Sequence, residues 1–301
     1  MYESYFGLRE KPFSLTPDPR YFYRSQCHAN ALELVQHGSR TPGGLTVVTG
    51  TGGTGKTTTC RTILEALDRT TFTSLVLNPY LSEEDLLRLI LQDFGVISRD
   101  EIRRGRLSGV RAAELLVTLE EFLKSLTSLG ARALLIIDEA QKLPVHVLEQ
   151  VKRLSRLAAE VPLQVILVGQ LGLTDSLRAP DLRPLDERVT IRYRLRPLTA
   201  GETAEYILHR VRIAGDQSPD LFPPRSLHRV HRATGGTPRL INLVCDRALL
   251  AAFSVQAIRI EPALVDRVAG ALRLEPAGSV ASLANMTGSV LNWMRRRVAA
   301  L

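Results

Sequence analysis

The residues with the clearest chemical signature form a glycine-rich run that follows a short apolar segment. They are Gly50, Thr51, Gly52, Gly53, Thr54, Gly55, Lys56, Thr57 and Thr58. Up to Thr57 the run matches G-x-x-x-x-G-K-[ST], whose glycines let backbone N–H groups converge on phosphate oxygens. We expect Lys56 to reach the β- and γ-phosphates and the Thr57 hydroxyl to bind Mg²⁺. The run therefore predicts a site for ATP and Mg²⁺.

Two adjacent carboxylates, Asp138 and Glu139, end a later apolar run. At the carboxyl end of a parallel strand, side chains face the ligand crevice. We expect Asp138 to hold Mg²⁺ through water and Glu139 to orient and polarise the attacking water. Both acids could instead cap the next helix, where acidic residues are common. The phosphate-binding loop upstream favours the catalytic interpretation.

Polar residues around the next two apolar runs are candidates for sensing and for charge stabilisation. Gln170 follows residues 164–169 and could sense the γ-phosphate or the attacking water, or be a turn residue. Arg188 is the first candidate, and Arg183 the second, for an arginine donated to the nucleotide of a neighbouring subunit. For any single arginine the alternative is a solvated surface charge.

Arg239 is the candidate from the C-terminal half of the chain. It follows Gly235-Gly236-Thr237-Pro238, in which the glycines end one helix and Pro238 suits the first turn of the next. An arginine at a helix start opposes the helix dipole, so its position indicates a role other than helix stability. Reaching the γ-phosphate from a small domain would be such a role.

The elements that position these residues alternate along the chain. Apolar runs predict strands at residues 45–49, 74–78, 133–138 and 164–169, and the alternating residues 189–195 could form a fifth strand. Amphipathic patterns between them predict helices at 57–67, 83–94, 111–126 and 145–157. After Pro197 the pattern predicts only helices, at 200–214, 224–233, 238–253 and 261–272. This order indicates an α/β fold, with a parallel five-stranded sheet flanked by helices and a small α-helical lid.

We expect four regions. Residues 1–40 form an aromatic and proline-rich segment packing on the ATPase core, and residues 41–198 the nucleotide-binding domain. Residues 199–274 form the helical lid, and residues 275–301 a C-terminal tail. In the tail, Trp293-Met294-Arg295-Arg296-Arg297 suggests an interfacial helix and peripheral membrane contact, although a solubilising tail is the simpler interpretation.

Composition limits the class of protein. An apolar fraction of 45% excludes wholesale disorder, and three separated cysteines exclude a disulfide framework. The polar, aromatic N-terminus and the lack of a long apolar run predict a cytoplasmic protein without a membrane span. The net charge of +8 suggests an anionic partner, which could be nucleic acid, an acidic lipid surface or nucleotide phosphates. Apart from His228 and His231, which are three residues apart, the histidines, His28 included, show no ligand spacing. Without Cys or carboxylate partners they are interpreted as surface residues and not as a metal site.

These features together resemble the AAA+ ATPases, and more closely the ExeA-type group. The resemblance covers residues 1–270 and is carried by the phosphate loop and by five further segments. These are Tyr5-Phe6-Gly7-Leu8, Pro12-Phe13 with Pro17-Asp18-Pro19, Ile136-Ile137-Asp138-Glu139-Ala140-Gln141, Val168-Gly169-Gln170, and Gly235-Gly236-Thr237-Pro238-Arg239-Leu240-Ile241-Asn242.

The resemblance implies an ATP-driven homo-oligomer whose active sites form between subunits. It implies sensor 1 at Gln170, sensor 2 at Arg239, a trans-acting finger near Arg188, and an adenine pocket lined by residues such as Phe13 and Tyr23. The expected function is an ATPase that assembles or remodels a protein partner of a secretion or cell-envelope system. The alternative is an ATP-dependent, DNA-binding regulator of transposition that works with duplex DNA and a transposase.

Overall fold

A computed structural model of the chain describes residues 2–16, 18–38, 44–98, 100–101, 109–215 and 220–274. The chain divides into two compact units. The sheet unit spans Arg24–Arg196, and the helical unit combines the residues up to Tyr23 with those from Pro197 onward. The tail expected at residues 275–301, with its Trp293–Arg297 motif, lies outside the described residues.

The sheet unit is built on five strands in the order β2-β3-β4-β1-β5. They are β1 (Leu45–Gly50), β2 (Thr71–Val76), β3 (Arg132–Ile137), β4 (Leu163–Gly169) and β5 (Val189–Leu195). Every neighbouring pair is parallel, as the alternation of apolar runs and helical patterns predicts. The α/β fold is therefore confirmed, although β2 begins earlier in the chain than expected.

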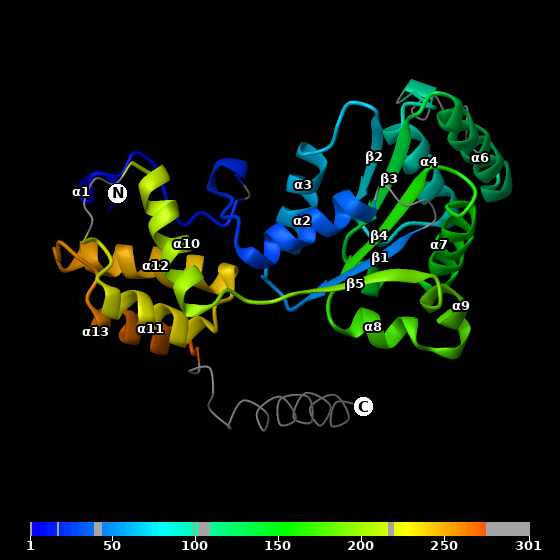
Figure 1. Ribbon diagram of the computed structural model, residues 1–301. Coiled ribbons are helices and arrows are strands. Elements are labelled where there is room, and N and C mark those ends of the chain that lie inside the picture. Colours follow the sequence, from blue (N-terminus) through cyan, green and yellow to red (C-terminus); the bar gives the residue numbers. More distant parts are fainter. Residues whose placement is uncertain are drawn as a thin grey trace. The chain divides into compact units, whose positions relative to one another are not determined.

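Helices cover both faces of this sheet (Figure 1). One face carries α2 (Gln26–Gly38) and α3 (Lys56–Glu65), and the other carries α4 (Glu83–Asp93), α6 (Ala112–Ser128) and α7 (Val145–Leu157). Strands buried on both faces are mostly apolar, which is why β1 and β4 show no regular alternation of apolar and polar residues. Short helices α8 (Gly172–Leu177) and α9 (Arg183–Asp186) connect β4 to β5.

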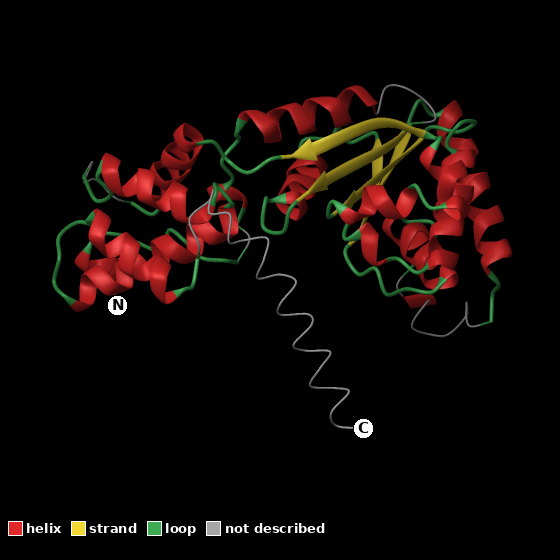
Figure 2. Ribbon diagram, turned by 90° about the horizontal axis from the view of Figure 1, so that it is seen from below, coloured by secondary structure: helices red, strands yellow, loops and turns green. Residues whose placement is uncertain are grey.

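The helical unit contains no strand among the residues described (Figure 2). Its main elements are α10 (Ala200–Ile213), α11 (Pro224–Thr234), α12 (Pro238–Ser254) and α13 (Pro262–Ala271). Thr199 begins α10 with a capping box, because its hydroxyl and the Glu202 carboxylate each accept a backbone N–H of the other residue. The predicted helices after Pro197 thus all form.

The N-terminal segment differs from expectation in what it packs against. Residues up to Tyr23, including α1 (Tyr2–Tyr5) and η1 (Pro19–Tyr21), share the apolar core of the helical unit. Phe13 is only 1% exposed and contacts Phe222 edge to face, with ring centroids 5.9 Å apart. A ring so enclosed by helical residues cannot line an adenine pocket without leaving this core. Only the part from Arg24 onward, which includes α2, belongs to the sheet unit.

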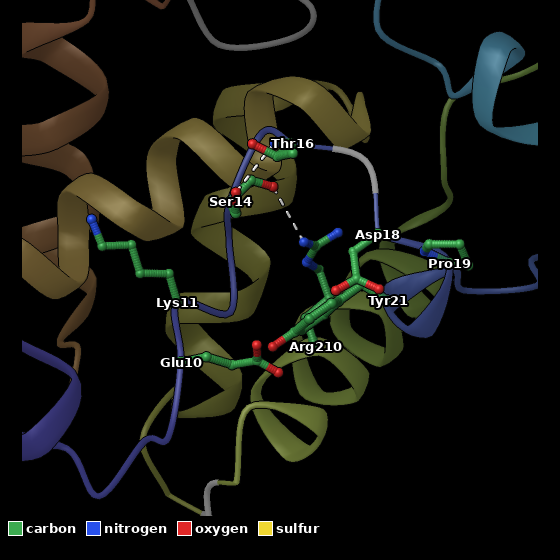
Figure 3. A pocket seen from close by; sticks show the side chains of 8 residues that line it. All are labelled: Glu10, Lys11, Ser14, Thr16, Asp18, Pro19, Tyr21 and Arg210. Atoms are coloured by element: carbon green, nitrogen blue, oxygen red, sulfur yellow. Dashed lines mark hydrogen bonds between the residues drawn. The ribbon is translucent and has the colours of Figure 1, made fainter.

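A buried arginine fastens this segment to the helices. Arg210 of α10 is 7% exposed, and its guanidinium donates to the carbonyls of Pro12 (2.5 Å) and Ser14 (3.3 Å). It also lies 4.6 Å from the ring centroid of Tyr21, and Figure 3 shows it between Ser14 and Tyr21. The hollow beside Arg210 is also lined by Glu10, Lys11 and Asp18.

Replacing Arg210 should therefore destabilise the helical unit. Arg210→Met keeps an apolar stem but leaves buried carbonyls without donors, at a cost of about 1–3 kcal/mol. The free energy of unfolding, measured by denaturant titration, should fall by this amount. Arg212→Met, at an exposed position of the same helix, is the matched control and should change it by less than about 0.5 kcal/mol. Equal effects of the two variants would contradict the anchoring role.

Candidate nucleotide-binding and hydrolysis site

The glycine-rich loop joins β1 to α3 at the carboxyl edge of the sheet. Gly53 (φ 82°) and Gly55 (φ 94°) adopt the left-handed backbone region that favours glycine. Gly50 is needed for space, since a Cβ there would lie 2.8 Å from the Thr54 hydroxyl oxygen. The Thr54 hydroxyl donates to the Thr51 carbonyl (2.9 Å) and so closes the turn. Gly52 has open space around it, and Thr58 continues the first turn of α3.

Lys56 is a buried cation whose hydrogen-bond acceptors are backbone carbonyls. Its side chain is 6% exposed, and its Nζ donates to the carbonyls of Gly50 (3.0 Å) and Thr51 (3.1 Å). Burial lowers the pKa of Lys56, and the nearby carboxylates of Glu139 and Asp138 partly oppose that effect. A desolvated ammonium held by neutral carbonyls at the first turn of a helix suits the binding of phosphate.

Thr57 and Asp138 form the second part of the site. The Thr57 hydroxyl donates to the Asp138 carboxylate, which is buried directly after β3. The Asp138 N–H donates to the Val76 carbonyl, which fixes this residue to the end of β2 (2.9 Å). Hydroxyl and carboxylate oxygens are the ligands that Mg²⁺ prefers. The described residues hold no cluster of three His, Cys, Asp or Glu, so phosphates and water would have to complete the shell.

Glu139 occupies a left-handed backbone conformation (φ 54°), which is uncommon for a residue other than glycine. Its Oε2 accepts from Lys142 Nζ (2.9 Å) and from Gln141 Nε2 (3.0 Å). The hydrogen bond from Lys142 lowers the pKa of Glu139, although partial burial opposes it. At neutral pH the group is therefore an ionised acceptor, the state that can orient a water molecule and take its proton.

Gln170 lies where β4 ends, beside this carboxylate network. Its backbone N–H donates to Gln141 Oε1 (2.9 Å), while its own side chain is exposed. Gln141 thus connects Glu139 to the end of β4. Sequence reasoning included Gln141 only as one letter of a family motif and gave it no role.

The prediction that His28 lies on the surface is wrong, and no signal in the sequence indicated its role. It is 4% exposed on α2, with Nδ1 2.6 Å from Ser25 Oγ and Nε2 3.2 Å from the Thr54 carbonyl oxygen. A carbonyl only accepts, so Nε2 must carry the proton. His28 therefore supports the phosphate loop from behind, where Gly55 leaves it room.

The two candidate finger arginines lie at the other end of the sheet unit. Because β5 runs parallel to β1, Arg188 before its first residue is at the amino edge, opposite the loop. Its guanidinium donates to the Ser155 carbonyl (3.2 Å), and exposed Arg183 pairs with Glu187 (3.1 Å). Neither joins the phosphate loop of its own chain. Their action on a neighbouring subunit stays a prediction.

Arg239 lies in the first turn of α12, as predicted, and its side chain is exposed. Gly235 ends α11 in the left-handed region, and a Cβ on Gly236 would lie 1.9 Å from the Leu198 carbonyl oxygen. This pair of glycines brings the turn against the chain that enters α10. The turn is thus fixed by packing, whereas the contact of Arg239 with a γ-phosphate stays a prediction.

Comparison with known proteins agrees with this geometry. Residues 39–177 match the family described as AAA domain. The chain is 41% identical over 256 residues to General secretion pathway protein A of Aeromonas hydrophila, covering 84% of this chain. It spans only 45% of that relative's length. The resemblance to ExeA-type AAA+ ATPases is thereby confirmed.

Solved structures with a similar fold are more distant in sequence. The ORC2 protein of Aeropyrum pernix, solved as ADPNP–ADP complexes, has a TM-score of 0.64 at 17% identity, covering 87% of this chain and 71% of its own. Cdc6p of Pyrobaculum aerophilum has a TM-score of 0.63 at 20% identity, and the match covers 85% of this chain and 69% of Cdc6p. The described part of this chain has no helix long and apolar enough to cross a membrane.

Proposed function

Because residues 39–177 match the AAA domain family and the chain is similar to General secretion pathway protein A, we propose that it binds ATP with Mg²⁺ and hydrolyses it to ADP and phosphate. The observation that carries this proposal is the buried ammonium of Lys56 beside the Thr57–Asp138 pair, with ionised Glu139 following in the chain. Three chemically different parts of a phosphoryl-transfer site meet at one edge of the sheet.

Each residue has a defined task in this reaction. The loop N–H groups and Lys56 hold the phosphates, while Thr57 and Asp138 hold Mg²⁺. The metal ion neutralises charge on the phosphate oxygens. Glu139 orients a water molecule and accepts its proton as the oxygen attacks the γ-phosphorus. The bond from that phosphorus to the bridging oxygen breaks, and ADP and phosphate leave.

The coupling of this reaction to a partner is a further part of the proposal. The similarity to General secretion pathway protein A supports an oligomer that uses ATP to assemble or remodel a protein of a secretion or cell-envelope system. In that oligomer Arg188, or Arg183, would reach the nucleotide of the adjacent subunit, and Gln170 and Arg239 would respond to its γ-phosphate. Cytoplasmic location and contact with a membrane through the tail belong to the same proposal.

The test is a steady-state ATPase assay of the purified protein, with and without duplex DNA, at low and high salt. Turnover that requires Mg²⁺ and is indifferent to DNA supports the proposal. Stimulation by DNA that fades with salt would instead favour the DNA-dependent alternative. DNA is included because a net charge of +8 favours contact with nucleic-acid phosphates. Sedimentation with and without ATP measures the oligomeric state. Absence of turnover under every condition would contradict the proposal.

A further inference from the structure

We propose that Gln141 is the positioning residue for hydrolysis, because it ties the Glu139 carboxylate to the end of β4. This inference rests on the proposed function and deepens it. The bridge has two hydrogen bonds: Gln141 Nε2 donates to Glu139 Oε2 (3.0 Å), and Gln141 Oε1 accepts the Gln170 N–H (2.9 Å).

The orientation of the Gln141 amide is determined by its partners. A carboxylate oxygen can only accept and a backbone N–H can only donate, so the amide nitrogen must face Glu139 and the amide oxygen must face Gln170. A flipped amide would lose both bonds. The glutamine amide thus meets both needs with one uncharged group, since it carries a donor and an acceptor on the same carbon.

The surrounding backbone is shaped to admit the bridge. Gln141 lies in η2 (Ala140–Lys142), a single turn that begins at the left-handed Glu139. On the β4 side, a Cβ on Gly169 would lie 2.6 Å from Gln141 Oε1. The absence of a side chain at Gly169 therefore gives the amide access to the Gln170 N–H. Ala140, fully buried under the turn, keeps η2 against the sheet unit.

Glu139 has a second partner, Lys142, that does not provide this connection. Lys142 Nζ contacts the same oxygen, Glu139 Oε2 (2.9 Å), but the lysine side chain is 44% exposed. The two residues are three apart in the chain, so this ion pair does not connect Glu139 to another element. Among the described residues, no protein group hydrogen-bonds Glu139 Oε1. Gln141 thus orients the carboxylate through one oxygen and leaves the other to accept from water.

Two substitutions separate positioning from packing. Gln141→Glu is isosteric and keeps an acceptor for the Gln170 N–H, but it replaces the donor to Glu139 with a second carboxylate that repels it. Gln141→Met has a similar volume and loses both hydrogen bonds. We expect both to lower kcat at least about tenfold, because a small displacement of a reacting group has a large effect on rate. The Kd for ATP should stay within about twofold of wild type, because neither variant changes the phosphate loop.

Lys142→Ala is the matched control, since it removes the other partner of the same oxygen and leaves the bridge intact. Its kcat should fall less than that of either Gln141 variant, because a lysine that is 44% exposed restrains the carboxylate only weakly. Wild-type turnover of Gln141→Glu would show that Gln141 only satisfies the Gln170 N–H, and would overturn the inference. A loss in Lys142→Ala equal to that in the Gln141 variants would also overturn it.

Crystal structures of the wild type and of Gln141→Met give a readout independent of turnover. The Glu139 side chain should leave its wild-type position in the variant while β4 and the phosphate loop stay in place. An unmoved carboxylate contradicts the positioning role even if ATP is never hydrolysed. Absence of wild-type hydrolysis contradicts the proposed function alone, so the two failures are distinguishable.

Discussion

Glu139→Gln should bind ATP as tightly as the wild type and hydrolyse it at least about 100-fold more slowly, the usual contribution of a general base. The amide has nearly the shape of the carboxylate but cannot take a proton from the attacking water. Lys56, Thr57 and Asp138 are unchanged, so the phosphates and Mg²⁺ keep their ligands. The loss should therefore appear in kcat and not in the Kd for ATP.

Single-turnover hydrolysis and equilibrium titration with a fluorescent ATP analogue measure the two quantities separately. Glu160→Gln, at an exposed position of the same unit, is the matched control and should leave both at wild-type values. The lost ion pair with partly exposed Lys142 should change the free energy of unfolding by less than about 1 kcal/mol. Normal turnover of Glu139→Gln would show that another group orients the water.

The parts of the site that could be predicted from the sequence are those set by local pattern. A glycine run between an apolar segment and a helical pattern defines the loop, because backbone geometry there depends on residue type. The pair Asp138-Glu139 could be placed because parallel strands end at a common edge. Both inferences need only neighbouring residues and the topology that alternating elements dictate.

The missed residues depend on contacts between distant segments. His28 contacts the Thr54 carbonyl from α2, a helix that the sequence pattern did not predict because it follows a proline-rich segment. Gln141 has a function only because η2 meets the end of β4, where Gly169 leaves space for it. Neither hydrophobic periodicity nor a short motif predicts such contacts between distant segments.

The N-terminal segment shows the same limit on a larger scale. Its aromatic residues indicate correctly that it packs on something, but composition cannot choose the surface. Arg210, which lies 198 residues after Pro12, donates hydrogen bonds to the Pro12 and Ser14 carbonyls and so holds this segment against the helical unit. Phe13 then fills the helical core beside Phe222, and the expected boundary at residue 40 moves to Tyr23.

Lys56→Met should weaken ATP binding by about 100-fold, because charge-assisted hydrogen bonds to phosphate contribute about 1.5–3 kcal/mol. In the free protein the ammonium is buried and donates to the Gly50 and Thr51 carbonyls, which are also close to where phosphates would bind. Methionine replaces the four-atom apolar stem of the lysine side chain and lacks only the terminal ammonium. The variant therefore removes the charge with little change in packing.

Thermal unfolding with and without MgATP distinguishes lost binding from lost folding. The ligand-free unfolding temperature of each protein is the baseline, so any loss of stability from the substitution itself is measured separately. The rise in unfolding temperature on adding MgATP, which reflects binding to the folded state alone, should be abolished. Lys124→Met, on the surface of α6, should keep the full rise. A normal rise in Lys56→Met would mean that nucleotide does not bind at this loop, and the assignments of Thr57, Asp138 and Glu139 would fail with it.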